Sequence, residues 1–406
     1  MKRILFLSGT GLVSLHLIDV ALVDVEPGAS LARHLPWMVV TLAVAAAAAL
    51  TYRRLPRTIR GAVAGTFGAL AAFDALQHAT AASDDLSVTG LLTLPAAALL
   101  LLGAAAGELW GLNRGRRRAP AWARRAAGTV GAVAFAAMVI APLAFAIYNV
   151  HKPRRALQHA ELGVPYRDVY FRSTDGIRIH AWWAPGRKQT AVVVVHGAGG
   201  DAYGARRQER ILAASGYGVL AIDARGRGLS EGDNENLGWH WDRDVRGGVD
   251  WLTARGITRI GALGLSTGAD AVIHAAGEDE RIGAVVADGS SLRSGADRGD
   301  WHGAESVLGK ITIGSAFPVY RLLAWSSEPP SLSSLTAKIA PRPLLLIATA
   351  KVSSERDVNR DRYRAAGEPK ALWVVDDAGH TGAAQRHPRE YARRIVATFE
   401  HTRIAR

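Results

Sequence analysis

The sequence of 406 residues contains no cysteine. Without a thiol, the chain can form no disulfide, can bind no metal through a thiolate and can use no cysteine nucleophile. Any covalent catalysis must therefore come from another residue type. The absence of cysteine does not by itself indicate the compartment in which the protein works.

The formal net charge of the chain is +13, but its distribution is not typical of a nucleic-acid-binding protein. Beyond residue 150 the positive charge is diffuse, with no basic helix and no stripe in which basic and aromatic residues alternate. Such features are typical of proteins that bind nucleic acid. We therefore expect no nucleic-acid partner.

The first 150 residues are rich in alanine and leucine and poor in charge. A helix needs about 20 mostly apolar residues to cross a bilayer. Five stretches come close to this length, at residues 4–24, 35–52, 60–80, 86–112 and 127–149. The first is the weakest because His16 and Asp19 interrupt it, and a signal peptide is the alternative there, since Lys2 and Arg3 precede an apolar run. The pattern predicts an all-α transmembrane bundle over residues 1–150 and contact with a lipid bilayer.

The positive charges of this region indicate its orientation, because short cytoplasmic loops are enriched in Lys and Arg. Arginines gather in two alternate loops, as Arg53, Arg54, Arg57 and Arg60 and as Arg114, Arg116, Arg117, Arg118, Arg124 and Arg125. Five spans then place residue 150 outside, although Lys152, Arg154 and Arg155 favour the opposite side. We expect a multi-pass membrane protein whose second domain, residues 151–406, is extracytoplasmic.

The second domain alternates short β-rich runs with longer amphipathic stretches, which predicts an α/β fold with a mostly parallel sheet flanked by helices. Residues 166–172 and 177–184 read as an opening antiparallel hairpin. The further strands are predicted at 191–195, 218–222, 259–265, 282–287, 344–348 and 371–375, and the helices at 206–215, 241–255, 268–276 and 388–402.

A G-x-S-x-G motif, Gly264 to Gly268, lies between a predicted strand and a predicted helix. A nucleophilic serine needs this spacing because it must sit on a sharp strand-to-helix turn, with glycines where a Cβ would clash. The following helix also directs its N-terminal N–H groups toward a developing oxyanion. The strand before the motif and the helix after it favour Ser266 as the nucleophile.

A glycine-rich turn, His196 to Gly200, directly follows the valine-rich strand at 191–195. Such a turn lets backbone N–H groups approach a substrate oxygen, and we expect an oxyanion hole made by the backbone N–H groups of Ala198 and Thr267. The alternative is a plain strand-to-helix turn. His196 itself is expected to anchor the loop rather than to act as a base.

Residues 160–403 resemble the α/β-hydrolase superfamily, particularly the serine esterases, lipases and related peptidases with an H-G-x-G-G turn. Residues 223–230, with the sequence DARGRGLS, are similar to the family's D-x-R-G-x-G-x-S turn. The resemblance implies an α/β-hydrolase fold without metal or cofactor. It also implies that His380, in the segment Asp376-Asp377-Ala378-Gly379-His380, is the general base of a Ser-His-acid triad.

The acid of the triad departs from the family pattern. The family places it a few residues after the strand that is here 344–348, but no carboxylate follows until Glu355 and then Asp357. Glu355 is nearer the usual offset and is our first choice, with Asp357 in reserve. Asp288 is a further alternative, because some members take the acid from the preceding strand.

An insert at residues 293–340 contains the aromatic residues Trp301, His302, Phe317, Tyr320 and Trp325. In this fold, such an insert commonly forms a lid over an apolar pocket. Packing of two short helices into the core explains the same aromatic residues equally well.

These features together predict a membrane-anchored serine hydrolase that cleaves a carboxylic ester, of a small molecule or a lipid, through an acyl-enzyme intermediate. Acyl transfer, thioester cleavage or peptide cleavage would use the same triad, because a fold does not determine a substrate. The alternative of another class is a non-catalytic membrane module that binds or senses a ligand.

Overall fold

The computed structural model describes residues 6–12, 14, 39, 42–43, 45–52, 54, 63, 161–232, 236–300, 317, 321 and 326–402. The chain divides into two compact units, one of Met1–Ile147 with Ile311–Val319 and the other of Tyr148–Lys310 with Tyr320–Arg406. In the first unit, the rings of Phe6 and Tyr52 stack with their centroids 4.1 Å apart.

No helix within the described residues is both long enough and apolar enough to cross a bilayer. Most residues of the five predicted spans, and the predicted domain boundary at residue 150, lie outside the described part of the chain. The transmembrane bundle therefore stays a prediction.

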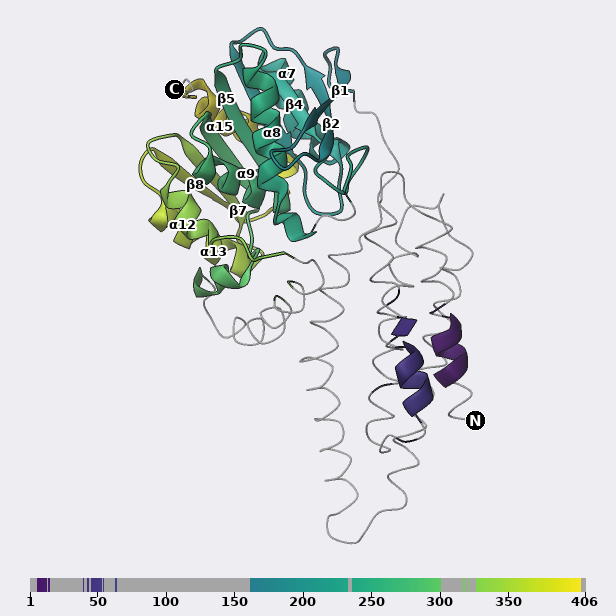
Figure 1. Ribbon diagram of the computed structural model, residues 1–406. Coiled ribbons are helices and arrows are strands. Elements are labelled where there is room, and N and C mark those ends of the chain that lie inside the picture. The colour runs from purple at the N-terminus through teal and green to yellow at the C-terminus, as the bar shows by residue number, and fades with distance from the viewer. Residues whose placement is uncertain are drawn as a thin grey trace, which may run out of the picture. The chain divides into compact units, whose positions relative to one another are not determined.

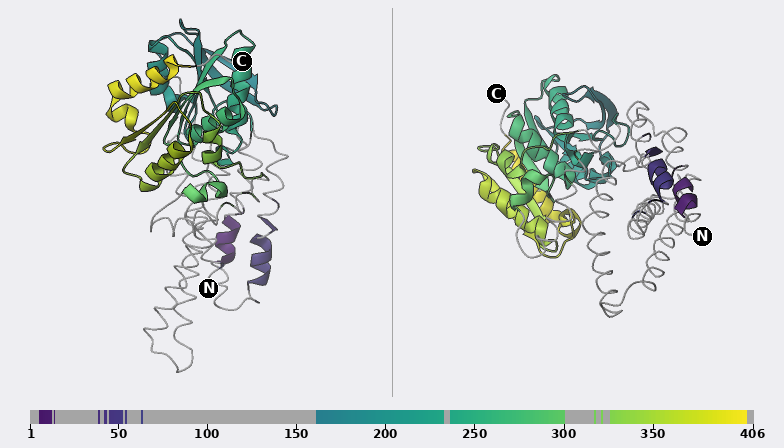
Figure 2. Two further views of the ribbon diagram at one scale, coloured as in Figure 1. Left: turned by 90° about the vertical axis from the view of Figure 1, so that its left-hand side faces the viewer. Right: turned by 60° about the horizontal axis from the view of Figure 1, so that its bottom comes forward.

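A twisted eight-stranded sheet forms the centre of the described second unit, in the order β1-β2-β4-β3-β5-β6-β7-β8 (Figures 1 and 2). The strands are β1 (Arg167–Arg172), β2 (Arg178–Ala184), β3 (Thr190–Val195), β4 (Gly218–Ile222), β5 (Arg259–Leu265), β6 (Ile282–Asp288), β7 (Leu344–Thr349) and β8 (Lys370–Val375). Their positions agree with the sequence pattern to within one residue at most ends, and the mostly parallel sheet that it predicted is confirmed.

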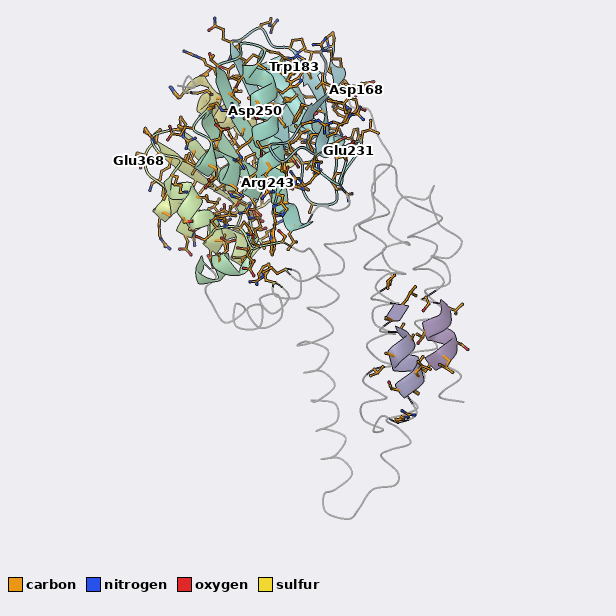
Figure 3. The ribbon with its side chains drawn as sticks, viewed as in Figure 1. Asp168, Trp183, Glu231, Arg243, Asp250 and Glu368 are labelled. Carbon is orange, nitrogen blue, oxygen red and sulfur yellow. The ribbon has the colours of Figure 1, made fainter. Side chains whose placement is uncertain are left out.

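The first two strands form the predicted antiparallel hairpin, and β2 is also antiparallel to β4. From β4 to β8 all pairs are parallel. Asp168 of β1 lies 3.0 Å from His180 Nε2, and Trp183 of β2 packs edge-on against Trp251 with centroids 5.5 Å apart (Figure 3).

Helices cover both faces of the sheet. They are α7 (Arg206–Ala214), α8 (Trp241–Thr253), α9 (Thr267–Glu278), α12 (Leu332–Ala337), α13 (Ser353–Ala365), α14 (Ala383–Arg386) and α15 (Pro388–Glu400), with the 3₁₀ helices η3 (Ala202–Ala205), η4 (Asn236–Gly238) and η5 (Gly295–Asp300). Because side chains alternate along a strand, the two faces bury different residues of β3. Val193 belongs to the hydrophobic cluster that includes residues of α8, α9 and α12, whereas Val192 and Val194 belong to the cluster that includes residues of α7 and α15.

Three of these α-helices were not predicted from the sequence. They are α13, which follows β7, the single turn α14, which precedes α15, and α12, which lies in the insert at 293–340. Much of that insert, including Trp301, His302, Tyr320 and Trp325, lies outside the described residues, so the lid stays a prediction. Phe317, from the same insert, is buried.

The parallel strands β5 to β8 bring their carboxyl ends to one edge of the sheet. This edge carries Ser266 after β5, Asp288 at the end of β6, Glu355 soon after β7, and His380 after β8. Residues far apart in sequence are therefore placed next to one another by the sheet itself.

Candidate active site

Ser266 occupies the turn between β5 and α9 with φ 54° and ψ −119°. A non-glycine residue in this region is strained, by about 1–3 kcal/mol. The turn is held on both sides: Ser266 N donates to the Asp288 carbonyl at 2.8 Å, and the Ser266 carbonyl accepts from Ala269 N at 2.8 Å. The serine is thus held on the sharp turn that its motif predicted.

The two glycines of the motif are required by close backbone packing. A Cβ on Gly264 would lie 2.1 Å from the Gly268 carbonyl oxygen. A Cβ on Gly268 would lie 2.4 Å from the His196 carbonyl oxygen. Backbone atoms at such distances cannot move aside as a flexible side chain could, so the G-x-S-x-G spacing follows from sterics.

Ser266, His380 and Glu355 form one hydrogen-bonded chain. His380 Nε2 lies 2.8 Å from Ser266 Oγ, and His380 Nδ1 lies 2.6 Å from Glu355 Oε2. A carboxylate can only accept, so the Nδ1 proton points to Glu355 and Nε2 is left to accept the serine proton. This tautomer is the one that a general base needs.

Glu355, in the first turn of α13, is the acidic residue that reaches His380. Its carboxylate is buried, and its second oxygen accepts from Thr349 N at 2.8 Å, at the end of β7. One helical turn further on, Asn359 Nδ2 donates to the Glu355 carbonyl at 2.8 Å. These contacts fix both the carboxylate and the helix end that carries it.

The two alternative acids have other partners. Asp357 lies 2.9 Å from Arg356 Nε and 3.7 Å from the Arg360 guanidinium. Asp288 is buried and accepts a hydrogen bond from the Tyr391 hydroxyl at 3.0 Å. Burial raises the pKa of Asp288 to about 7. Neither carboxyl makes the contact with His380 that Glu355 makes.

The protonation of His380 depends on its acidic partner. The hydrogen bond with Glu355 raises the pKa of His380 above its ordinary value, and partial burial of the ring opposes this shift. The imidazole thus holds a proton more firmly than a free histidine does. A base of this kind has a greater affinity for the hydroxyl proton of Ser266.

The turn at 196–200 passes directly beside the serine. A Cβ on Gly197 would lie 3.3 Å from Ser266 Cβ. Ala198 is exposed in this turn, and Thr267 is the first residue of α9. Both predicted oxyanion-hole residues therefore lie in segments that border Ser266, one on the turn and one on the helix.

Arg227 holds this turn in place, a role that was not predicted from the sequence. Its buried guanidinium donates to the carbonyl of Gly199 at 2.9 Å and to that of Gly200 at 3.1 Å. One side chain therefore fixes two successive carbonyl groups of the turn. The only sequence signal was a second arginine in the glycine-rich segment 223–230.

His196 anchors the turn, as expected. Its Nε2 accepts from Ala224 N at 3.1 Å, so Nδ1 carries the proton and donates to the Gly197 carbonyl at 2.7 Å. The ring is fully buried and packs against Trp241, with centroids 5.0 Å apart.

In the described part of the chain, no group of three or more His, Asp or Glu side chains is arranged to hold a metal ion.

Comparison with known proteins places these observations in a family context. A model described as "Alpha/beta hydrolase family" matches residues 192–394. One crystal form of an esterase from Pyrococcus furiosus is 25% identical over 62% of this chain and 99% of its own, with a TM-score of 0.50. A dienelactone hydrolase from Anabaena variabilis is 19% identical over 59% of this chain and 98% of its own, with a TM-score of 0.43. No curated protein sequence matches significantly.

The raised pKa of His380 can be tested by measuring how the chemical modification of this residue depends on pH. Diethyl pyrocarbonate modifies only neutral imidazole, so the rate at which it modifies His380, followed by peptide mass spectrometry, should reach half its maximum above pH 6.5. Replacing Glu355→Gln removes the interaction that raises the pKa of His380 most, and leaves burial, which lowers it, with the smaller effects of the charges of Asp288 and Asp270, which raise it. The midpoint should then fall below that of the wild type.

Asp357→Asn is the matched control, because it removes a carboxylate on the same helix that contacts arginines instead of His380. It should leave the midpoint of His380 unchanged. An equal shift in the two variants, or none in Glu355→Gln, would contradict the assignment of Glu355 as the partner.

Proposed function

This chain belongs to the alpha/beta hydrolase family, and we propose that it is a serine hydrolase that cleaves carboxylic esters through an acyl-enzyme intermediate. One observation carries the proposal: the continuous hydrogen-bonded chain from Ser266 Oγ through His380 to Glu355, with distances of 2.8 and 2.6 Å. The Pyrococcus furiosus protein to which the chain is similar is itself an esterase, which supports ester cleavage as the reaction.

The first half-reaction forms the acyl-enzyme. His380 Nε2 takes the proton from Ser266 Oγ as this oxygen attacks the ester carbonyl. Glu355 stabilises the resulting imidazolium, and the backbone N–H groups of Ala198 and Thr267 stabilise the oxyanion. When the tetrahedral intermediate collapses, the C–O bond to the alcohol breaks and His380 returns its proton to the leaving alcohol.

The second half-reaction repeats the same steps with water. His380 takes a proton from water as the hydroxide oxygen attacks the acyl carbon. Collapse of the second intermediate releases the carboxylic acid and returns the proton to Ser266. The overall reaction consumes one water and produces one acid and one alcohol. His380 takes one proton from Ser266 and one from water, and it returns one to the alcohol and one to Ser266, so the steps balance without an oxidant or reductant.

Active-site labelling provides the test of this function. The full-length protein should react covalently with a fluorophosphonate, and Ser266→Ala should abolish both the label and ester hydrolysis, with kcat reduced about 10⁵-fold or more. Ser215→Ala is a suitable control, because its hydroxyl donates to the Ile211 carbonyl at the end of α7. Folded wild-type protein that remained unlabelled would instead favour the non-catalytic binding module.

We also propose that residues 1–150 anchor the enzyme in a membrane, with the hydrolase domain outside the cytoplasm. The support is the sequence pattern alone: five apolar stretches, with arginines gathered in alternate loops. Protease added to intact cells should degrade the domain that carries Ser266, and a cytoplasmic marker protein should survive. Protection of the domain, together with its degradation after lysis, would overturn this orientation.

A further inference from the structure

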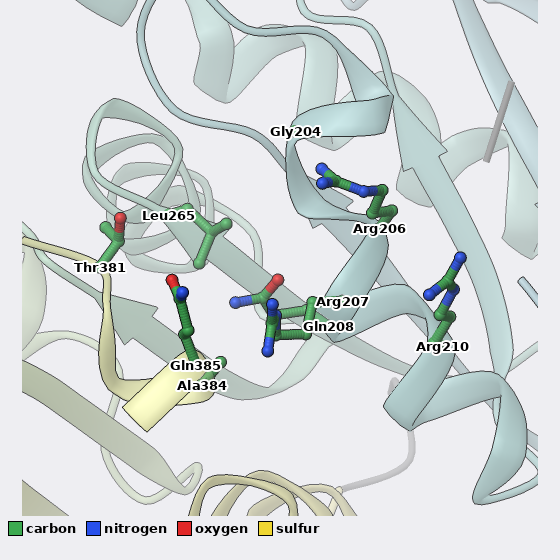
Figure 4. A pocket seen from close by; sticks show the side chains of 9 residues that line it. All are labelled: Gly204, Arg206, Arg207, Gln208, Arg210, Leu265, Thr381, Ala384 and Gln385. Carbon is green, nitrogen blue, oxygen red and sulfur yellow. The ribbon is translucent and has the colours of Figure 1, made fainter. Parts of the chain in front are cut away.

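A pocket of about 440 Å³ lies beside the triad. Its wall includes Leu265 and Thr381, which directly precede Ser266 and follow His380 in the chain. The pocket therefore borders the two segments that carry the reacting side chains, although Ser266 and His380 themselves are not among its lining residues. Figure 4 shows α7 on one side of the pocket, with Thr381, Ala384 and Gln385 opposite.

The pocket is strongly basic. Three arginines of α7 line it, namely Arg206, Arg207 and Arg210, and its other polar side chains are the amides of Gln208 and Gln385 and the hydroxyl of Thr381. Within the described part of the chain, none of its lining residues is acidic. The first of these arginines begins α7, so the positive end of the helix dipole adds to the same field.

Two of the arginines that line the pocket contact neutral groups in the described part of the chain. Arg206 donates to the Tyr203 carbonyl at 3.1 Å and stacks over the Tyr203 ring at 4.0 Å, and Arg210 Nε donates to the Glu161 carbonyl. Within the described residues, none of the three arginines forms an ion pair. Their contacts with neutral groups orient the guanidinium groups but leave their charge uncompensated.

The one acidic residue of α7 does not alter this balance. Glu209 is fully buried, and no hydrogen-bond partner meets either of its carboxyl oxygens within the described residues. Burial raises the pKa of Glu209 well above its usual range, which favours the uncharged acid. Glu209 also faces the core instead of lining the pocket.

A second contact orients the amide in the wall. Gln208 is buried, and its Nε2 donates to the Tyr391 hydroxyl at 3.3 Å. Tyr391 in turn donates to Asp288 at 3.0 Å. The amide nitrogen of Gln208 is thus held toward the core, and the arginines are the charged donors left for a ligand.

We propose that this pocket, here called the arginine pocket, binds an anionic group of the ester substrate, a carboxylate or a phosphate. The proposal rests on the esterase function and names its substrate class. Guanidinium groups suit these anions because they present parallel N–H donors to two oxygens at once. With the anion held by Arg206, Arg207 and Arg210, the scissile carbonyl of a substrate of suitable length lies at Ser266, and the anionic group itself undergoes no reaction.

A pair of soluble substrates tests the proposal on the full-length protein in detergent. One is the 4-nitrophenyl half-ester of adipic acid, which carries a free carboxylate, and the other is its methyl ester, which has no charge. Release of nitrophenol gives kcat/KM for each. The wild type should prefer the charged substrate by about tenfold or more, since a charge-assisted hydrogen bond is worth about that factor.

Variants of Arg207 assign the preference to the pocket, because this side chain is exposed and lines the pocket. Arg207→Gln should reduce the ratio of the two kcat/KM values about tenfold. Arg207→Lys keeps the charge but loses the two parallel N–H donors, so it should reduce the ratio by a smaller factor. The matched control is Arg364→Gln, which removes an exposed positive charge at the end of α13, outside the pocket. It should leave the ratio unchanged.

Ionic strength gives a second readout that a purely structural role would not alter. Raising the salt concentration to about 0.5 M screens charges over a few ångströms, so it should reduce the wild-type preference. In Arg207→Gln the preference should respond less to salt. A preference insensitive to salt would contradict binding through exposed arginines.

A lipid pair identifies the source of the anion. Fatty-acid release from detergent-dispersed 1-oleoyl-glycerol-3-phosphate is compared with release from 1-oleoylglycerol, in the wild type and in Arg207→Gln. An arginine-dependent preference for the phosphate supports a lipid headgroup as the ligand, and one confined to the adipate pair supports a soluble anionic ester. No arginine-dependent preference in either pair would overturn the proposal.

The same experiments distinguish a failure of the esterase proposal from a failure of the arginine-pocket proposal. If Ser266-dependent hydrolysis of the uncharged methyl ester is observed without any preference for the charged one, the esterase function stands and the arginine pocket does not bind the substrate anion. If neither substrate is hydrolysed and the fluorophosphonate does not react, the esterase function fails, and the substrate assignment fails with it.

Discussion

The hydrogen bond between Ser266 and His380 joins residues 114 positions apart, and it depends on the common edge at which parallel strands end. Ser266 follows β5, Glu355 follows β7 and His380 follows β8. The register of these strands therefore decides whether the three side chains meet. A slip of one residue moves a strand by about 3.3 Å, which is more than a hydrogen bond tolerates. The pairings of β5 to β8 are therefore a requirement of the site as well as of the core.

Each member of the hydrogen-bonded chain is held by contacts of its own. Ser266 is held by the glycines around it, Glu355 by Thr349 N and Asn359, and the turn beside them by Arg227. Some of these contacts come from backbone atoms, and the others come from the buried side chains of Asn359 and Arg227. The strain at Ser266, about 1–3 kcal/mol, is sustained because the surrounding backbone leaves no room to relax.

Negative and positive side chains lie in neighbouring parts of the site. Glu355 and buried Asp288 lie near the imidazole and favour its charged form, whereas three arginines line the pocket next to Leu265 and Thr381. The proposed arrangement would therefore stabilise the imidazolium and also attract an anion into the neighbouring pocket.

The eight strands and the position of the nucleophile could be predicted from the sequence, because the strands coincide with apolar runs and the turn at Ser266 is marked by glycines. The helix α13 could not, since its sequence SSERDVNRDRYRA has almost no apolar periodicity. The acid was ambiguous for the same reason: residues two apart on a helix point in different directions, so choosing between Glu355 and Asp357 requires the helical phase. The arginine pocket needed tertiary structure, because its walls come from α7 and from residues 381–385.

In the proposed mechanism, the Ser266 hydroxyl attacks the substrate and His380 acts as its base. Mass spectrometry of the full-length protein, quenched within the first turnover of a slowly deacylated 4-nitrophenyl ester, tests it most directly. We expect the mass of the wild-type protein to increase by that of the acyl group, on the peptide that contains Ser266. The His380→Ala variant should show no such increase. Nitrophenol release at the full rate without an adduct, or an adduct on a different residue, would contradict it.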